Sequence, residues 1–322
     1  MEVVAIMMPA RSLRRFTLLA ALIVVAVFVC ASPAQAQTRE GAFERTLKVT
    51  GAVDLSVQAG SGQIRVQPGP TGSVRIAARL KSGGSWTASD SDIEARIKKI
   101  EQNPPIEQQG NTIRIGRFVD EDLSRNISIS YDVTVPADTT VTASTGSGSI
   151  VIGAGKGTVA ASSGSGSIQV DGAASLKAHT GSGSIHAAAV AGAISAQSGS
   201  GSITIAQTGP GEVSVSAASG GVTLTGVNGA AKVSSASGSI KIDGRPIAPW
   251  SLHSSSGGIT ITVPPNAAFD VDARTSSGSI SSAFPVTMTV TGKIDTHDIQ
   301  GKVGGGGPLV QVSCSSGSIR IK

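Results

Sequence analysis

The sequence predicts an all-β protein, a single-stranded β-solenoid (parallel β-helix) with about 18–19 residues and two strands in each coil, and one short helix inserted in its N-terminal part. Three observations favour this fold. A Ser-Gly-Ser-Ile tetrapeptide recurs at a near-constant period, two short apolar stretches accompany it in each repeat, and aromatic residues make up only 3% of a chain with 41 glycines. Stacked coils of small side chains account for all three.

The tetrapeptide, or a close variant of it, ends each time in an isoleucine or a valine. These residues are Ile150, Ile168, Ile185, Ile203, Val222, Ile240, Ile259 and Ile280, with a further copy at Ile319. Identical units at a constant period stack most naturally in parallel and in register, which brings like residues about 4.8 Å apart. Antiparallel hairpins are the alternative arrangement.

Each repeat holds two apolar stretches that predict its two strands. One follows the glycine turn, as in Ile168 and Val170, and the other precedes the next turn, as in Leu176 and Ala178. Alternation with period two predicts strands with one face turned inward. Because the inward residues are small, we expect a thin coil, and the Gly, Ser and Asn of the turns suit positive φ angles.

One serine occupies an equivalent turn position in successive repeats. These serines are Ser147, Ser165, Ser182, Ser200 and Ser237. Stacked hydroxyls can bond to one another or to turn backbone, so we interpret them as a structural turn ladder. The functional alternative is a regular hydroxyl array that faces solvent and could meet a polysaccharide or ice.

Residues 37–135 depart from the repeat and are predicted to form N-terminal capping coils. The capping box Ser91-Asp92-Ile93-Glu94 begins a helix that Pro104-Pro105 ends, which predicts a helix insertion at about 91–102. We expect this amphipathic helix to pack over an end or a side of the solenoid. Residues 136–322 are predicted to be regular repeats with a C-terminal cap, because exposed terminal ladders must be covered.

Residues 1–36 are predicted to be a secretory signal peptide. A basic region with three arginines precedes the apolar run 16–31, and Ala34 and Ala36 fit the small-x-small cleavage rule. An uncleaved membrane anchor is the alternative. We therefore expect an exported protein, whether periplasmic, on the outer surface or secreted, with no membrane span after signal removal.

The rest of the chain offers little for catalysis. Cleavage leaves Cys314 as the single cysteine, so no internal disulfide or cysteine-paired metal site is predicted, and no cofactor motif is present. His179 and His186 are expected to be a surface pair rather than metal ligands. Between residues 150 and 263 the acids lie 30 to 40 residues apart, whereas glycan cleavage needs paired carboxylates. These acids are Asp171, Glu212 and Asp243.

The charge of the chain argues against nucleic acid as a partner. The formal net charge is +5, and loss of three arginines and Glu2 with the signal leaves +3. Lysines and arginines are scattered, whereas a phosphate-binding surface needs them clustered. The partner is therefore unknown, with an envelope protein or a glycan as the expected class.

Four features resemble a bacterial family of unknown function, the β-strand-repeat "putative adhesins", which is related to the head domain of "putative autotransporter adhesins". The features are the Ser-Gly-x-Ile repeats, Gly110-Asn111-Thr112-Ile113 after the helix, Tyr131-Asp132-Val133-Thr134-Val135-Pro136, and the closing Ser316-Gly317-Ser318-Ile319. The resemblance implies a β-solenoid exported to the envelope. The family usually has Asp where this chain has Ser in its turns, and the resemblance supplies no catalytic residues.

Three functional hypotheses follow. The favoured one is an exported envelope or cell-surface solenoid with a structural or adhesive role, which binds through an extended side and has no catalytic activity. The second is a glycan- or ice-binding module that uses stacked Ser/Thr rows, although Thr204, Thr223 and Thr260 give only patches. The third is a polysaccharide-acting enzyme, which would need two carboxylates within about 10 Å of each other in a cleft.

Overall fold

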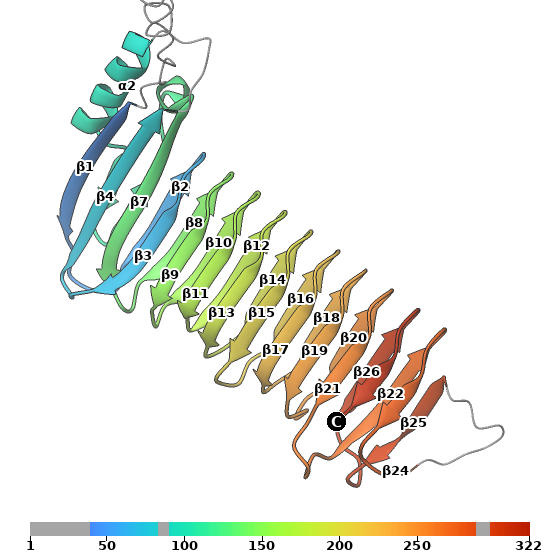
Figure 1. The fold of residues 1–322 in the computed structure, drawn as a ribbon. Coiled ribbons are helices and arrows are strands. Elements are labelled where there is room, and N and C mark those ends of the chain that lie inside the picture. The colour runs from blue at the N-terminus through green and yellow to red at the C-terminus, as the bar shows by residue number, and fades with distance from the viewer. Residues whose placement is uncertain (1–38, 83–89, 288–296) are drawn as a thin grey trace, which may run out of the picture. The chain divides into compact units, whose positions relative to one another are not determined.

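The computed structural model describes residues 39–82, 90–287 and 297–322. The predicted signal peptide, with Ala34 and Ala36, lies outside the described residues. Over the described part the chain runs back and forth between two sheets, of 13 and 14 strands (Figure 1). The predicted β-solenoid is confirmed. Among the described residues no helix is long and apolar enough to cross a membrane.

In the regular part of the fold, the first sheet, sheet A, contains the strands that follow the glycine turns. In spatial order the strands of sheet A are β1 (Glu40–Lys48), β4 (Ser73–Ser82), β7 (Ile127–Pro136), β3 (Ile64–Gly69), β9 (Ile150–Ala154), β11 (Ile168–Gly172), β13 (Ile185–Val190), β15 (Ile203–Gln207), β17 (Val222–Val227), β19 (Ile240–Gly244), β21 (Ile259–Thr262), β27 (Ile319–Ile321) and β23 (Ile280–Ser282).

The second sheet, sheet B, contains the strands that precede those turns. In spatial order they are β24 (Val286–Thr287), β25 (Asp298–Val303), β22 (Phe269–Thr275), β26 (Leu309–Cys314), β20 (Trp250–Ser254), β18 (Ala231–Ser235), β16 (Val213–Ala217), β14 (Ile194–Ser198), β12 (Ser175–Thr180), β10 (Thr158–Ser163), β8 (Thr140–Thr145), β2 (Asp54–Ala59), β6 (Thr112–Ile115) and β5 (Ile106–Gln109).

In the regular part every coil gives one strand to each sheet, and successive coils pair in parallel and in register. Ile168 lies between Ile150 and Ile185, and Leu176 lies between Val159 and Ile194. Parallel pairing follows because each coil returns the chain to the same sheet in the same direction. The antiparallel alternative is confined to the ends.

The core is a column of aliphatic side chains between the sheets. The isoleucine or valine that ends each tetrapeptide is at most 1% exposed at Ile150, Ile168, Ile185, Ile203, Val222, Ile240, Ile259 and Ile319. Burial of one such side chain stabilises the fold by about 1.5–3 kcal/mol. The repeat therefore carries the main driving force for folding, whereas Ile280, on the edge strand β23, is only half-buried.

At both ends of the stack, the order of the strands in space differs from their order in the chain. At the N-terminal end β2 lies between β6 and β8, and β3 lies between β7 and β9, so the first coil is covered by a later one. At the other end β26 lies between β20 and β22, as Figure 1 shows, and β27 lies between β21 and β23. The chain therefore closes by insertion of its last coil between two earlier coils.

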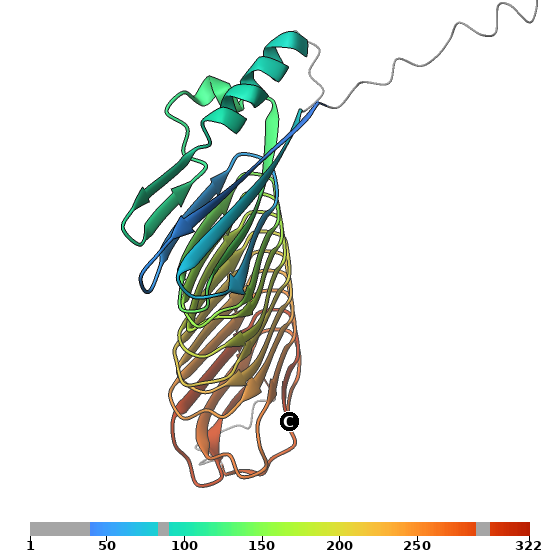
Figure 2. The same ribbon diagram turned by 90° about the vertical axis from the view of Figure 1, so that its left-hand side faces the viewer.

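Antiparallel strands and one helix complete the N-terminal end. β1, β4 and β7 pair antiparallel, as do β5 and β6, and α2 (Asp90–Gln102) packs on β1 (Figure 2). The helix buries Ile93, Ile97 and Ile100. Gly41 allows this approach, because a Cβ there would collide with Ile97 Cγ2.

Candidate binding surfaces

The predicted turn serines lie on the surface of the stack. The side chains of Ser147, Ser165, Ser182, Ser200 and Ser237 are all exposed. Their backbone takes part in the ladder between coils: Ser182 N–H donates to Gly164 O over 3.2 Å, and Ser200 N–H donates to Gly181 O over 3.1 Å. Their hydroxyls are therefore available to solvent or to a ligand.

A second set of hydroxyls, two residues earlier in each turn, is buried and bonds the coils together. Thr180 Oγ1 donates to Gly166 O of the adjacent coil over 3.0 Å and accepts from Gly183 N over 3.1 Å. The same side-chain-to-carbonyl bond is made by Thr145, Ser163, Ser198, Ser235, Ser254 and Thr275. Sequence reasoning missed this set, although the period-two alternation of Leu176 and Ala178 continues inward to Thr180.

Cys314 takes the same position in the last coil. Its Sγ donates to Gly257 O over 3.2 Å. Burial raises the pKa of the thiol, so it remains protonated at neutral pH and is poorly reactive. Cys314, the single cysteine among the described residues, is thus a structural element of the turn.

Turn glycines are needed for close stacking. A Cβ on Gly183 would collide with Gly166 O, and a Cβ on Gly166 would collide with Gly148 O. Positive φ angles, which we expected of the turn glycines, occur at Gly226 and Gly229 but not at these stacked positions. Glycine is needed at these positions because the neighbouring coil leaves no room for a Cβ, and not because the turn requires a positive φ angle.

A groove runs along sheet B beside these turns. Its wall is one outward side chain per coil, in the order His179, Gln197, Ser216, Ser234, His253, Ser313 and Arg274, which we call the polar row. A hollow of about 540 Å³ extends from His179 to His253, and one of about 190 Å³ continues to Arg274. Small turn residues such as Gly199, Ala218 and Ala236 leave this space open.

The polar row presents donors and acceptors at the spacing of the coils. Ser234 Oγ donates to Ser216 Oγ over 3.2 Å, and His253 Nδ1 lies 2.8 Å from Ser313 Oγ. The lining contains hydroxyl, amide, imidazole and guanidinium groups and no carboxylate. Such a surface can bind an extended polar chain, whereas acid–base hydrolysis would need paired carboxylates.

Neither the histidine pair nor the threonine patch forms a larger site. His179 lies in β12 of sheet B and His186 in β13 of sheet A. In the described part of the chain no group of three His, Cys, Asp or Glu residues could hold a metal ion. On sheet A Thr204 and Thr223 are neighbours, but Lys241 separates Thr223 from Thr260.

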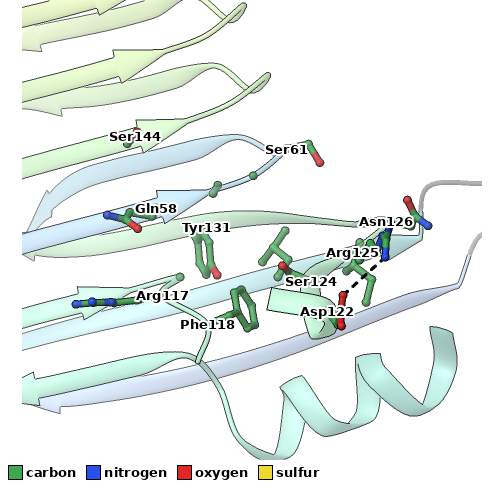
Figure 3. Close-up of a pocket in the computed structure, with 15 residues that line it drawn as sticks. Gln58, Ser61, Arg117, Phe118, Asp122, Ser124, Arg125, Asn126, Tyr131 and Ser144 are labelled. Atoms are coloured by element: carbon green, nitrogen blue, oxygen red, sulfur yellow. Dashed lines mark ion pairs between the residues drawn. The ribbon is translucent and has the colours of Figure 1, made fainter. Parts of the chain in front are cut away.

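A larger groove opens at the N-terminal end, between the turn 59–61 and the loop 116–126 (Figure 3). In a regular coil a short turn joins the two sheets, but here η1 (Glu121–Ser124) and its flanking residues join β6 to β7. A Cβ on Gly60 would meet nothing within 4 Å, whereas one on the equivalent Gly146 would lie 2.5 Å from Gly60 O. The missing stacked turn leaves a cavity of about 990 Å³.

Charged and aromatic side chains line this N-terminal groove. Arg117 is exposed and Phe118 is half-buried. Arg125 Nη1 lies 3.8 Å from Asp122 Oδ1, as the dashed line in Figure 3 shows. Asn126 adopts a left-handed conformation, with φ 62°, which asparagine tolerates better than most residues. The lining therefore carries two arginines and one aspartate.

Tyr131 lies at the floor of the groove and is 1% exposed. Its hydroxyl is buried and has no hydrogen-bond partner among the described residues. Burial raises the pKa of the phenol far above neutrality, so the hydroxyl keeps its proton. In Figure 3 the hydroxyl points toward Phe118. An unpaired buried hydroxyl destabilises the free protein.

We expect Tyr131→Phe to raise the free energy of unfolding by about 1 kcal/mol, because it removes a polar atom that burial leaves unpaired and keeps the ring. Urea denaturation of residues 37–322, followed by circular dichroism, measures this change. A loss of stability of the same size would instead show that the hydroxyl has a partner within the fold.

Comparison with known proteins finds a matching family. The model of the family described as Toastrack DUF4097 matches residues 85–322. A search of curated proteins finds no match. Solved structures similar to this chain include a "putative adhesin" from Bacteroides fragilis, with 12% identity, 88% of this chain and 97% of that chain covered, and a TM-score of 0.37.

Two further solved structures are similar over the same share of this chain. A "putative lipid binding protein" from Parabacteroides distasonis has 13% identity, with 88% of this chain and 97% of that chain covered, and a TM-score of 0.37. A "putative cell adhesion protein" from Clostridium sporogenes has 11% identity, with 88% of this chain and 99% of that chain covered, and a TM-score of 0.25.

Proposed function

The chain belongs to the Toastrack DUF4097 family, and we propose that it is an exported envelope or cell-surface solenoid with an adhesive or structural role, which binds an extended partner along sheet B. The basic region, apolar run and Ala34-Gln35-Ala36 of the N-terminus support export. The partner is a glycan chain or an extended segment of an envelope protein.

The polar row carries this proposal. It places one hydrogen-bonding side chain per coil from His179 to Arg274, along two hollows that both border His253. A partner with a repeating backbone can contact each coil in the same way, so many weak contacts add up along the groove. The exposed turn serines, such as Ser200 and Ser237, widen the polar surface next to it.

We propose that the protein has no catalytic activity. The acids Asp171, Glu212 and Asp243 belong to different coils, and none of them lines the groove of sheet B. We therefore expect no hydrolysis of any glycan on incubation with the mature protein. Turnover that disappears when one of these carboxylates is replaced by its amide would overturn this.

A glycan fits the groove better than ice does. Ice binding requires a flat and regular row of threonines, whereas Lys241 interrupts the threonine row of sheet A after Thr223. In the polar row the hydroxyls of Ser216 and Ser234 bond to each other. Hydroxyl pairs of this kind can donate to and accept from sugar hydroxyls.

Filling the groove should weaken binding. Residues 37–322 are tested for capture of detergent-solubilised envelope proteins and on a glycan array. We expect Ala236→Arg, which places a long side chain in the groove, to weaken retention at least about tenfold. Ala188→Arg on sheet A is the matched control, because Ala188 is also exposed and lies outside the groove. Equal retention by the two variants would rule out this surface.

A further inference from the structure

The groove at the N-terminal end is separate from the polar row and has the features of a small-ligand site. Its volume of about 990 Å³ is at the upper end of the range of small-molecule pockets, about 300–1,000 Å³. Four segments line it: the end of β2 with the turn that follows, the loop 116–126, the first half of β7, and Ser144 of β8. The loop replaces a regular turn, so the cavity is a built departure from the repeat.

The charge of the groove favours an anion. Among the described residues Arg117 has no ion-pair partner, and it is exposed. The Arg125–Asp122 pair is long, and both side chains are more than three-quarters exposed, so it holds Arg125 only weakly. A guanidinium group matches carboxylate and phosphate oxygens in two-point contacts.

The remaining lining favours a sugar ring. Phe118 is one of only six phenylalanines in the chain and stands half-buried at the wall, where its ring can cover the apolar face of a pyranose. Gln58 and Asn126 supply amides that both donate and accept. At the floor the hydroxyl of Tyr131 is a buried donor that the fold leaves without a partner.

We propose that this groove binds an anionic sugar unit, a sugar ring that carries a carboxylate or a phosphate. Arg117 pairs with the anionic group, Phe118 packs against the ring, and Gln58 and Tyr131, which lie on the same side of the groove as Arg117 in Figure 3, bond to ring hydroxyls. The site would hold one unit of an acidic envelope polysaccharide while the polar row contacts the rest of a polymer or another partner. It extends the proposed binding role to a second, charge-selective position.

The test compares an acidic saccharide with its neutral ester and with two other anions. Binding of tri-galacturonate, its methyl ester, a galactose phosphate and an oligo-glutamate peptide to residues 37–322 is measured by calorimetry and by NMR. We expect the acid to bind at least about tenfold more tightly than the neutral ester. Equal affinity for acid and ester, or tighter binding of an acidic peptide than of either saccharide, would overturn the proposal. Preference for the phosphate or for the uronate identifies the source of the anion.

Variants then locate the site. Arg117→Gln should remove the preference for the acid, and Tyr131→Phe should weaken binding about fivefold without a fall in melting temperature. A Tyr131→Phe protein that melts lower and binds normally would show a structural hydroxyl and overturn the role of Tyr131. Unchanged binding by Arg117→Gln would place the anion elsewhere.

The proposal for the N-terminal groove and the proposed function can be tested independently of each other. Ala236→Arg should leave the uronate affinity unchanged, since the two grooves are lined by different residues. Conversely, Arg117→Gln should leave capture by the polar row unchanged. Loss of uronate binding in both variants would show that the N-terminal groove is not an independent site.

Discussion

Gly183→Ala is expected to lower the free energy of unfolding by at least about 3 kcal/mol. The added Cβ would collide with Gly166 O and would lie 2.8 Å from Ser167 N. Both are backbone atoms of the neighbouring coil, held there by the parallel ladder, so neither can move aside as a flexible side chain would. Relief of the collision requires the two coils to separate.

Separation of one pair of coils affects the whole stack, because each coil of a solenoid is stabilised by its neighbours. Denaturant unfolding of residues 37–322 measures the loss. Gly60→Ala is the matched control, since a Cβ there would meet nothing within 4 Å and the φ angle is not positive. A comparable loss in both variants would mean that backbone freedom, and not stacking, is what these glycines provide.

Thr180→Val should lower the free energy of unfolding by about 2–4 kcal/mol, although it preserves the shape of the side chain. Thr180 is fully buried, and its hydroxyl bonds to Gly166 O and Gly183 N. Valine would leave the carbonyl of Gly166 and the N–H of Gly183 without this partner, at a side chain that is itself fully buried. The same denaturation experiment measures the effect.

Two substitutions test whether the hydroxyl itself is responsible. Thr180→Ser keeps the hydroxyl and should cost about 1 kcal/mol or less, because serine serves at the equivalent Ser163 and Ser198. Ala217 takes this position in its own coil, in register between Ser198 and Ser235. Ala217→Ser should therefore stabilise the protein by about 1 kcal/mol. A serine at either position that behaves like valine or alanine would exclude the hydrogen bonds as the cause.

Several features could be predicted from local patterns. The alternation of Ile168 with Val170 predicted a strand with one face inward, and the constant period predicted parallel coils in register. The resemblance to the β-repeat "putative adhesins" is confirmed by the family match over residues 85–322. These features are local or periodic, so each repeat provides independent evidence for the same geometry.

The candidate sites could not be predicted to the same extent. The sequence pattern predicted Ser182 as a residue of the turn ladder. The buried hydroxyl that bonds two coils belongs instead to Thr180. The polar row could not be predicted, because it depends on the strand register that aligns His179, Ser216 and His253 along sheet B. The N-terminal groove depends on how far the loop 116–126 departs from a turn, which no repeat pattern specifies.

By itself the sequence determined the coil: its two strands, its inward rows of Ile and Val, and its small turn residues. All of these follow from side-chain alternation and period, which act over a few residues. Only the tertiary structure decided the order of the coils at the two ends, where β26 and β27 lie between earlier strands. A ladder needs matching register and not adjacency in the chain, so contacts between distant segments leave no local mark in the sequence.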